Sequence, residues 1–334
     1  MPGPEGSSGL PALAADQPTE QTTGGSAGPA RRSRTADRVA VTLFLLPALA
    51  LFVLLVLAPI ALGAYNSFFK WNGFVDIPMR YVGLDNFERL FSDVTFKGDL
   101  WRGFVLILLS VTLQLPMALG LAMLLNQHLR FRSLYRLLFF APYVLSEVIT
   151  AVLFEMVFSP SHGMANAVLS WALPGTINLQ WLADPDSVLL VVFFVISWKY
   201  FGFHMILYLA GRQNIPKELT EAATTDGATP WQVFRHITLP LLGPTIRVSI
   251  FLSIIGTIQQ FDMIWVLTEG GPIHASETMA VTLFQHGFKR FDVGYASAIS
   301  IAMFLISLVF GLLYQRFVMR RDIEGAITSI GNRQ

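Results

Sequence analysis

Long apolar runs separated by short polar segments dominate the chain after its first few dozen residues. Each run approaches or exceeds the roughly 20 mainly apolar residues that a helix needs to cross the hydrocarbon core. An unpaired backbone amide in lipid costs several kcal/mol. Each segment that crosses the bilayer is therefore expected to be a helix, because a helix pairs its backbone groups internally. The pattern therefore predicts an all-α polytopic membrane protein with six transmembrane helices. The six runs are Val39–Gly63, Gly103–Leu125, Leu137–Phe158, Ser187–Gly211, Val248–Thr268 and Val293–Gln315.

The two ends of the chain differ from this pattern. Residues 1–38 are rich in Gly, Pro, Ser, Ala, Thr and Gln and contain no aromatic residue, which predicts a disordered tail. A cleaved signal peptide is the less favoured alternative, because the first apolar run is longer than the roughly 7–15 residues of a signal core. We expect a six-helix transmembrane domain over residues 39–318, with a cytoplasmic loop at 212–244, and a second tail over 319–334.

Composition supports lipid as the solvent. The chain is 53% hydrophobic and 13% charged, whereas an ordinary soluble domain is about 25% charged. The net charge of +1 gives no reason to expect a nucleic-acid partner, and the absence of cysteine excludes disulfides and thiolate metal sites. Glu147 and Glu155 lie on roughly one face of the third span, but we predict no metal site, because no further ligand follows at a suitable spacing.

Basic residues are distributed unequally between the two sides of the predicted spans. The positive-inside rule assigns the richer side to the cytoplasm, so both termini are predicted to be cytoplasmic in a multi-pass protein of the plasma (inner) membrane. The richer side holds Arg31, Arg32, Arg34, Arg38, Arg130, Arg132, Arg136, Arg212, Lys217, Arg235, Arg316, Arg320, Arg321 and Arg333.

The loop between the fourth and fifth spans carries the signals of two short helices. Asn214 is a candidate cap for the first helix, Pro216 suits its first turn, and Gly227 supplies its C-terminal stop. Thr229 and Gln232 form a capping-box pattern for the second helix. The residues expected to end that helix and lead into the fifth span are Pro240 and Pro244. The loop is therefore predicted to be a structured cytoplasmic hairpin.

The same loop resembles the cytoplasmic signature of binding-protein-dependent ABC importer permeases. The matching positions are Glu221, Ala222, Ala223, Asp226, Gly227, Ala228, Phe234, Ile237, Leu239, Pro240 and Pro244. Motifs of the carbohydrate-uptake branch follow the same resemblance at 81–87, 268–272 and 295–298. The outer-loop motif at 81–87 looks most like the first subunit of maltose or glycerol-phosphate permeases. The resemblance implies a type I ABC importer permease fold.

The resemblance also implies partners and roles. The loop would form coupling helices held by a cytoplasmic ABC ATPase dimer, beside a second permease subunit in a heterodimer and an extracytoplasmic solute-binding protein. The permease itself would bind no cofactor, since ATP belongs to the ATPase, and this chain has no phosphate-binding Gly-rich loop with a Lys. We expect Glu221 to pair with a basic ATPase residue and Gly227 to permit close approach. The alternative is that the loop is merely a well-capped hairpin.

Polar and aromatic residues within the fourth and fifth spans are the candidates for a substrate path. An ionisable group inside a span is costly and usually faces a cavity or a partner. A sugar needs aromatic faces for its C–H surface and amide or carboxylate groups for its hydroxyls. The predicted path residues are Lys199, Tyr200, Phe203, Thr257, Gln260 and Asp262. Asp262 and Lys199 forming a structural ion pair remains open, and His204 is expected to be a packing residue.

Other classes of membrane protein and other substrates would leave different patterns in the sequence. A secondary transporter should show inverted repeats, and a membrane enzyme should show a nucleophile or metal motif; neither pattern is found. A phosphate substrate should require several basic groups along the path, which favours a neutral sugar, and weakly an oligosaccharide. The turn at Gly270, Gly271 and Pro272 is either a docking surface for the binding protein or a tight loop, and we favour docking. The prediction is a sugar permease whose energy comes from a separate ATPase.

Overall fold

The computed structural model describes residues 34–127, 129–173 and 178–319. The predicted tails lie outside the described residues for the most part, so their disorder stays a prediction. By its internal contacts the chain divides into two units, residues 1–56 and 57–334.

The first unit is helical over its described residues. It contains α1 (Arg34–Phe52) and most of the π-helical segment η1 (Val53–Leu57). Large apolar side chains from Val41 onward are exposed all around this helix, among them Phe44 at 88%. A helix that is apolar on every face needs an apolar surrounding. This is the expected signature of a membrane span.

The second unit is built almost entirely from helices, and one two-stranded antiparallel hairpin of β1 (Phe69–Lys70) and β2 (Arg80–Tyr81) joins them. Its first helices are α2 (Ala58–Asn66), α3 (Asp85–Ser92), α4 (Val94–Leu109), η2 (Ser110–Gln114), α5 (Leu115–Leu125), α6 (Arg132–Val144), α7 (Glu147–Val157) and α8 (Met164–Ala172). The others are α9 (Val188–Gln213), α10 (Lys217–Thr225), α11 (Pro230–Val233), η3 (Phe234–Thr238), α12 (Leu239–Leu241), α13 (Gly243–Ile258), α14 (Asp262–Thr268), α15 (Met279–Phe284), η4 (Gln285–Lys289), α16 (Val293–Tyr314) and η5 (Gln315–Met319).

Six candidate spans are present among the described residues if each bent helix pair counts as one. Four are continuous: Val41–Asn66, Val94–Leu125, Val188–Gln213 and Val293–Met319. The other two are the pair Arg132–Val144 and Glu147–Val157, bent by 99°, and the pair Pro230–Leu241 and Gly243–Ile258, bent by 65°. The prediction of an all-α, six-span chain is confirmed in this form. The second span begins earlier than expected, because α4 includes the charged turn around Asp99.

Two predicted spans are not continuous helices. The run 137–158 breaks at Leu145 and Ser146, both of which have extended backbone. The run 248–268 breaks at 259–261, between α13 and α14. Neither break contains Gly or Pro, so the apolar pattern alone gives no sign of it. Tertiary hydrogen bonds satisfy the freed carbonyls instead: Thr278 Oγ1 donates to the backbone oxygen of Gln260 at 3.0 Å.

The predicted loop hairpin is present, with two corrections. Thr229 and Gln232 form the full capping box, and Gly227 takes a left-handed φ of 85° after α10. Asn214, however, lies at the C-terminal end of α9, and the N-cap of α10 is Pro216. The physical reason is that a residue preceding proline avoids helical backbone, so the new helix starts after Pro216. The second correction is that Pro240 does not end the second helix, which continues to Leu241 before the bend.

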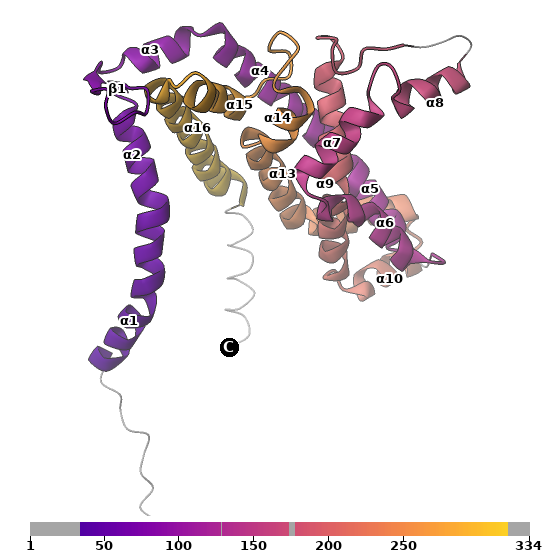
Figure 1. Ribbon diagram of the computed structural model, residues 1–334. Helices are drawn as coiled ribbons and strands as arrows, with labels where there is room; N and C mark the ends of the chain where they lie inside the picture. Colours follow the sequence, from indigo (N-terminus) through magenta and orange to yellow (C-terminus); the bar gives the residue numbers. More distant parts are fainter. Residues whose placement is uncertain (1–33, 128, 174–177, 320–334) are drawn as a thin grey trace, which may run out of the picture. The chain divides into compact units, whose positions relative to one another are not determined.

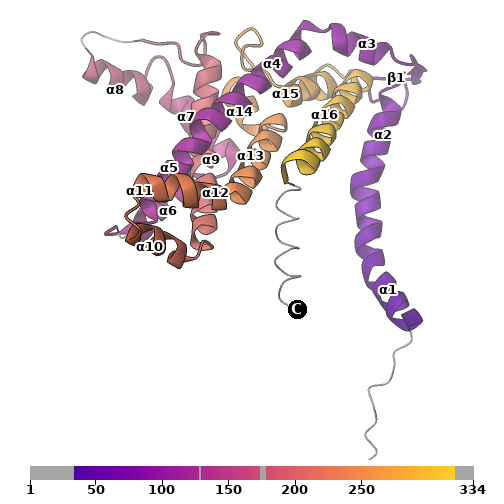
Figure 2. The ribbon, with the colours of Figure 1, turned by 180° about the vertical axis from the view of Figure 1, so that it is seen from behind.

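The central helix α9 organises the packing of this unit. It contacts α5 and α6 along its length, and its buried residues join two of the three core clusters. At Gly202 an added Cβ would lie 1.8 Å from the backbone oxygen of Phe139 in α6, which is a clash. The observed packing of α6 against α9 therefore requires glycine at position 202. The third core cluster joins α3, α4, α15 and α16. Figures 1 and 2 show α10–α12 at one end of these helices, with α3 and the loop after α14 at the other.

Candidate functional site

A cavity of about 400 Å³ lies where the two helix breaks meet. Broken helices at membrane depth are tolerated where the irregular backbone is buried in protein or lines a cavity. The residues that flank the first break, those of the second break, one face of α9, part of α13 and the π-helical segment η2 contribute. The lining residues are Ser110, Gln114, Tyr143, Glu147, Ile196, Tyr200, Phe203, His204, Leu252, Ser253, Gly256, Thr257, Gln259, Gln260, Phe261 and Asp262.

Glu147 is the polar centre of the cavity. It begins α7, where the helix dipole favours a negative charge. Its two carboxylate oxygens accept from different elements: Tyr200 donates its hydroxyl to Oε1, and Gln260 donates from Nε2 to Oε2 at 3.0 Å. The carboxylate therefore ties α7, α9 and the second break together. The sequence pattern singles out Glu147 only through its spacing from Glu155, and Glu155 is exposed and does not line the cavity.

Lys199 has a different role from the one predicted. Its side chain is 3% exposed and does not line the cavity. The ammonium donates to the backbone oxygens of Leu145 and Tyr143, at the end of α6. A cation is stabilising at a helix C-terminus, where carbonyls lack helical partners. The alternative of an ion pair with Asp262 is wrong, since no such pair occurs among the described residues and Lys199 is engaged at the first break.

The other five predicted path residues all line the cavity. Tyr200 and Phe203 come from α9, while Thr257, Gln260 and Asp262 come from α13, the break and the start of α14. Asp262 is exposed and makes no hydrogen bond or ion pair with any described residue. Its carboxylate is thus available to a ligand in the cavity.

An aromatic wall faces these polar groups. The rings of Tyr143 and Phe203 stack with centroids 4.9 Å apart, and Tyr143 meets Tyr200 edge-on at 6.0 Å. His204 lies behind this wall, 4% exposed, with Nδ1 2.8 Å from the hydroxyl of Ser249. It is a partnered packing residue, as predicted, although its edge also borders the cavity.

Hydroxyl and amide groups from η2 and α13 complete the lining. Ser110 bonds Gln114 and Ser253, each at 2.7 Å, which joins η2 to α13. Thr257 donates to the backbone oxygen of Ser253 at 2.9 Å. The chemistry of the cavity is therefore that of a polyol site: flat apolar rings on one side and carboxylate, amide and hydroxyl groups on the other.

The loop at 212–244 presents its predicted coupling residues in two groups. The backbone N–H groups of Gly227 and Ala228 donate to the carbonyls of Thr224 and Ala223, which closes α10 in a Schellman motif. Glu221, Ala222, Asp226, Gly227 and Pro240 are exposed, and Ala223, Ala228, Phe234, Ile237 and Leu239 are half-buried. A shallow cleft of about 490 Å³ lies between α10 and the second helix, lined by Ala223, Asp226, Gly227, Ala228, Gln232, Val233, His236 and Ile237.

The loop after α14 is a tight, hydrogen-bonded turn. Gly270 has a φ of 87°, and Gly271 precedes a cis proline, Pro272. Ser276 closes the turn by donating to the backbone oxygen of Gly271 at 2.7 Å. At the tip, Ile273 is 87% exposed. A rigid turn that exposes an apolar residue has the form of a contact surface.

Known proteins resemble this chain over most of its length. The family model described as "Binding-protein-dependent transport system inner membrane component" matches residues 114–322. The sulfoquinovosyl glycerol transport system permease protein of Agrobacterium fabrum is 32% identical over 286 residues, which are 86% of this chain and 92% of that protein. The trehalose/maltose transport system permease protein of Thermococcus litoralis is 33% identical over 282 residues, 84% of this chain and 94% of the relative.

A solved structure agrees with these sequence matches. It is the crystal structure of a bacterial alginate ABC transporter in complex with an alginate pentasaccharide-bound periplasmic protein. One of its chains superposes with a TM-score of 0.74 at 26% identity, covering 85% of this chain and 96% of that one. The broken helices and the cavity described above thus belong to a fold shared with a membrane importer.

Proposed function

The chain belongs to the family of binding-protein-dependent transport system inner membrane components, and from this we propose that it carries a neutral sugar, in particular an oligosaccharide, into the cytoplasm. It is a multi-pass membrane permease of an ABC importer with the type I fold, and a transport component rather than an enzyme. An extracytoplasmic solute-binding protein delivers the sugar to it. That last step is supported by the alginate importer, whose structure includes a periplasmic protein holding a pentasaccharide.

The observation that carries the proposal is the cavity at the two helix breaks. Its aromatic wall of Tyr143 and Phe203 suits the C–H face of a pyranose ring. The opposite side offers Asp262, which has no other partner among the described residues, and Gln260 and Thr257 beside it. Sugar hydroxyls can donate to this carboxylate and to the amide oxygen. The hydrogen bond from the Tyr200 hydroxyl to Glu147 links α9 to the start of α7 across the cavity.

The charge of the cavity favours a neutral sugar over an anionic one. Glu147 and Asp262 line it, and neither Lys nor Arg occurs among the described residues of its lining. Lys199 directly precedes the lining residue Tyr200, but its ammonium donates to a backbone oxygen at the end of α6. A phosphate or carboxylate entering this site would meet two carboxylates without a counter-charge, which is unfavourable in a low-dielectric site. A glycerol-phosphate substrate is disfavoured on this ground.

We assign energy coupling to the loop at 212–244. Its exposed Glu221 would pair with a basic residue of an ABC ATPase dimer, and the cleft beside Gly227 would receive an ATPase segment. The exposed methyl group of Ala222 and the absence of a side chain at Gly227 permit close approach. A second permease subunit would complete the heterodimer. Glu221, Ala222, Ala223, Asp226, Gly227 and Ala228, with Phe234, Ile237, Leu239 and Pro240, form the proposed contact.

The proposed orientation puts both termini and the coupling loop in the cytoplasm. The excess of Lys and Arg on that side supports it. The arrangement of the second unit is consistent with this orientation, because the coupling loop and the turn at Gly270–Pro272 lie at opposite ends of its helices (Figures 1 and 2). On this view the turn with the exposed Ile273 is where the solute-binding protein docks.

Uptake by the reconstituted importer tests the proposal. The full chain is assembled with its partner permease and ATPase in liposomes, and the solute-binding protein is added outside with labelled maltose-type oligosaccharides, a uronate oligosaccharide or glycerol phosphate. We expect ATP-dependent uptake of a neutral oligosaccharide and at most slow uptake of the anions. Uptake by this chain alone without ATP, or preferential uptake of an anion, would contradict the proposal.

A further inference from the structure

A basic cleft lies at the end of the molecule that carries the β-hairpin, away from the sugar cavity. Its volume is about 530 Å³. Four cationic residues and one carboxylate are among its lining residues: Lys70, Arg80, Arg89, Arg290 and Asp292. The transport function proposed above makes no use of this cleft.

The hairpin holds two of these cations directly opposite each other. In the antiparallel pair of β1 and β2, Lys70 faces Arg80. Like charges opposite one another on a ladder are destabilising. Neither side chain has a hydrogen bond or ion pair with any described residue, and the carboxylate of Asp292 is bound to Arg89 at 2.7 Å. The pair therefore lacks a counter-charge from the described part of the chain.

A buried donor in the wall of the cleft is also unsatisfied. His286 is 6% exposed, and an N–H group of Arg290 donates to its Nε2 at 3.3 Å, so the ring proton belongs on Nδ1. Nδ1 has no hydrogen-bond partner among the described residues, and a carboxylate oxygen of Asp292 is 4.0 Å away. Burial, with the positive charges of Arg290 and Arg89, lowers the pKa of His286 and keeps the ring neutral at neutral pH. The cleft thus presents positive charge to an anion, and its wall contains one buried N–H group that is unpaired among the described residues.

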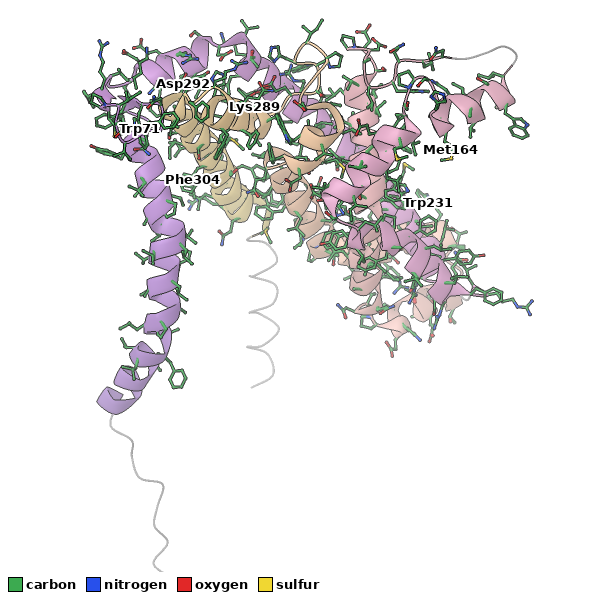
Figure 3. The ribbon with its side chains drawn as sticks, viewed as in Figure 1. Trp71, Met164, Trp231, Lys289, Asp292 and Phe304 are labelled. Atoms are coloured by element: carbon green, nitrogen blue, oxygen red, sulfur yellow. The ribbon has the colours of Figure 1, made fainter. Side chains whose placement is uncertain are left out.

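The position of the cleft indicates where that anion comes from. Lys70 and Trp71 follow the candidate span that ends at Asn66, and Arg290 precedes the one that begins at Val293. The backbone N–H of Gly294 donates to the oxygen of Trp71 at 3.1 Å, which fixes the hairpin at the start of α16. Figure 3 shows Trp71 and Asp292 near each other in this region. Tryptophan and basic residues at span ends lie at the level of the lipid headgroups.

The hairpin tip adds an apolar surface beside the cations. Val75 is 97% exposed, and Phe74 and Ile77 are each 50% exposed. The ring of Phe74 packs against Phe291, a lining residue, at 5.4 Å. Exposed apolar side chains next to a basic cleft match a membrane surface, with acyl chains on one side and phosphates on the other.

We propose that this cleft binds the phosphate of an anionic phospholipid in the leaflet facing the solute-binding protein, with Lys70 and Arg80 sharing the phosphate and the hairpin tip against the acyl region. The bound lipid supplies the counter-charge that the Lys70–Arg80 pair lacks. It also anchors the hairpin against α16, close to the interface where both adjoining spans end.

The affinity of the assembled importer for phosphatidylglycerol tests this inference. Native mass spectrometry of the delipidated complex measures the apparent Kd of the first phosphatidylglycerol bound. The double variant Lys70→Gln/Arg80→Gln is expected to weaken it about tenfold or more, because charge-assisted hydrogen bonds to phosphate are lost. Lys97→Gln, an exposed lysine outside the cleft, should leave it unchanged, and Arg80→Lys should largely preserve it.

Three results would overturn the proposal. The first is unchanged phosphatidylglycerol binding by the double variant, or by Lys70→Gln alone if the double variant does not assemble. The second is competition by soluble glycerol phosphate at the same concentration, which would indicate a free-phosphate site. The third is normal lipid binding together with weakened binding of the solute-binding protein, which would make the cleft a protein-docking surface.

Discussion

Gln260 donates a hydrogen bond from Nε2 to Oε2 of Glu147 at 3.0 Å, and this contact joins two helix breaks that lie 113 residues apart in the chain. Tyr200 occupies the other oxygen of the same carboxylate. Glu147 thus satisfies two donors from two elements, and the shape of the cavity depends on it. An amide in its place would turn an oxygen toward only one of these donors and an NH2 group toward the other.

Glu147→Gln is therefore expected to lower sugar uptake by about tenfold or more, since one of two partly buried donors loses its acceptor at a cost of roughly 1–3 kcal/mol. The amide has the same size and can accept from Tyr200 or from Gln260 through its single carbonyl oxygen, but not from both. The initial rate of sugar uptake into liposomes measures the effect. Glu155→Gln is the matched control, because that carboxylate is exposed and lies outside the cavity. Equal uptake by the two variants would show that the contact is dispensable.

Lys199→Met is expected to destabilise the protein rather than alter its sugar preference. The ammonium is bound to the final carbonyls of α6, and its loss leaves these partly buried acceptors unpaired at a cost of about 1–3 kcal/mol. The melting temperature of the purified complex should fall, while the KM for sugar in the remaining active fraction stays nearly constant. Gln260→Ala, by comparison, should raise the KM. A changed KM without a change in melting temperature would instead make Lys199 a substrate ligand.

Gly227→Trp is expected to abolish uptake while the chain still reaches the membrane. Any L-residue at a φ of 85° adds roughly 1–2 kcal/mol of backbone strain. Gly227→Ala carries that strain with little bulk, and no described atom lies within 4 Å of its added Cβ. The alanine variant should therefore keep much of its uptake and co-purify with the ATPase, whereas the tryptophan variant should lose both. Equal loss in both variants would assign the effect to backbone strain and count against ATPase contact at this glycine.

Thr229→Ala is expected to loosen the second loop helix by about 1 kcal/mol, the usual worth of an N-cap side chain. The hydroxyl accepts from the backbone N–H of Gln232, and the backbone N–H of Thr229 donates to Gln232 Oε1 at 2.7 Å. Hydrogen exchange in residues 230–241 should become faster, with a partial loss of uptake. Thr225→Ala serves as the control, because its exposed hydroxyl donates to the backbone oxygen of Glu221 within α10 and makes no hydrogen bond to the described residues of the second loop helix. Unchanged exchange in the Thr229 variant would show that the capping box does not hold the helix.

The sequence was most informative where local rules act alone. Apolar length located the membrane helices, and the spacing of Thr229 and Gln232 gave the capping box, since both depend on neighbours in the chain. The family motifs at 221–244 identified the class of transporter. Five of the six predicted path residues line one cavity. They could be predicted because aromatic and polar side chains stand out within otherwise apolar spans.

What the sequence did not indicate depends on tertiary contacts. The breaks at 145–146 and 259–261 contain no helix-breaking residue, and they exist because Lys199 and Thr278 satisfy the freed carbonyls from other helices. The role of Glu147 was missed for the same reason, since its partners come from α9 and from the second break. An acidic residue inside an apolar run is the signal that could have identified it.

Protection of a single introduced cysteine tests the central claim most directly. The chain contains no cysteine, so in Thr257→Cys a thiol adduct on this chain reports on the cavity alone. The importer is held with a non-hydrolysable ATP analogue, with and without the transported sugar, and the rate of modification by a methanethiosulfonate reagent is measured by mass spectrometry. We predict that sugar slows labelling at residue 257 by about tenfold, the effect of a ligand held at ten times its Kd, while Glu155→Cys is labelled equally in both states. Equal labelling of Thr257→Cys with and without sugar would contradict the assignment of this cavity as the sugar path.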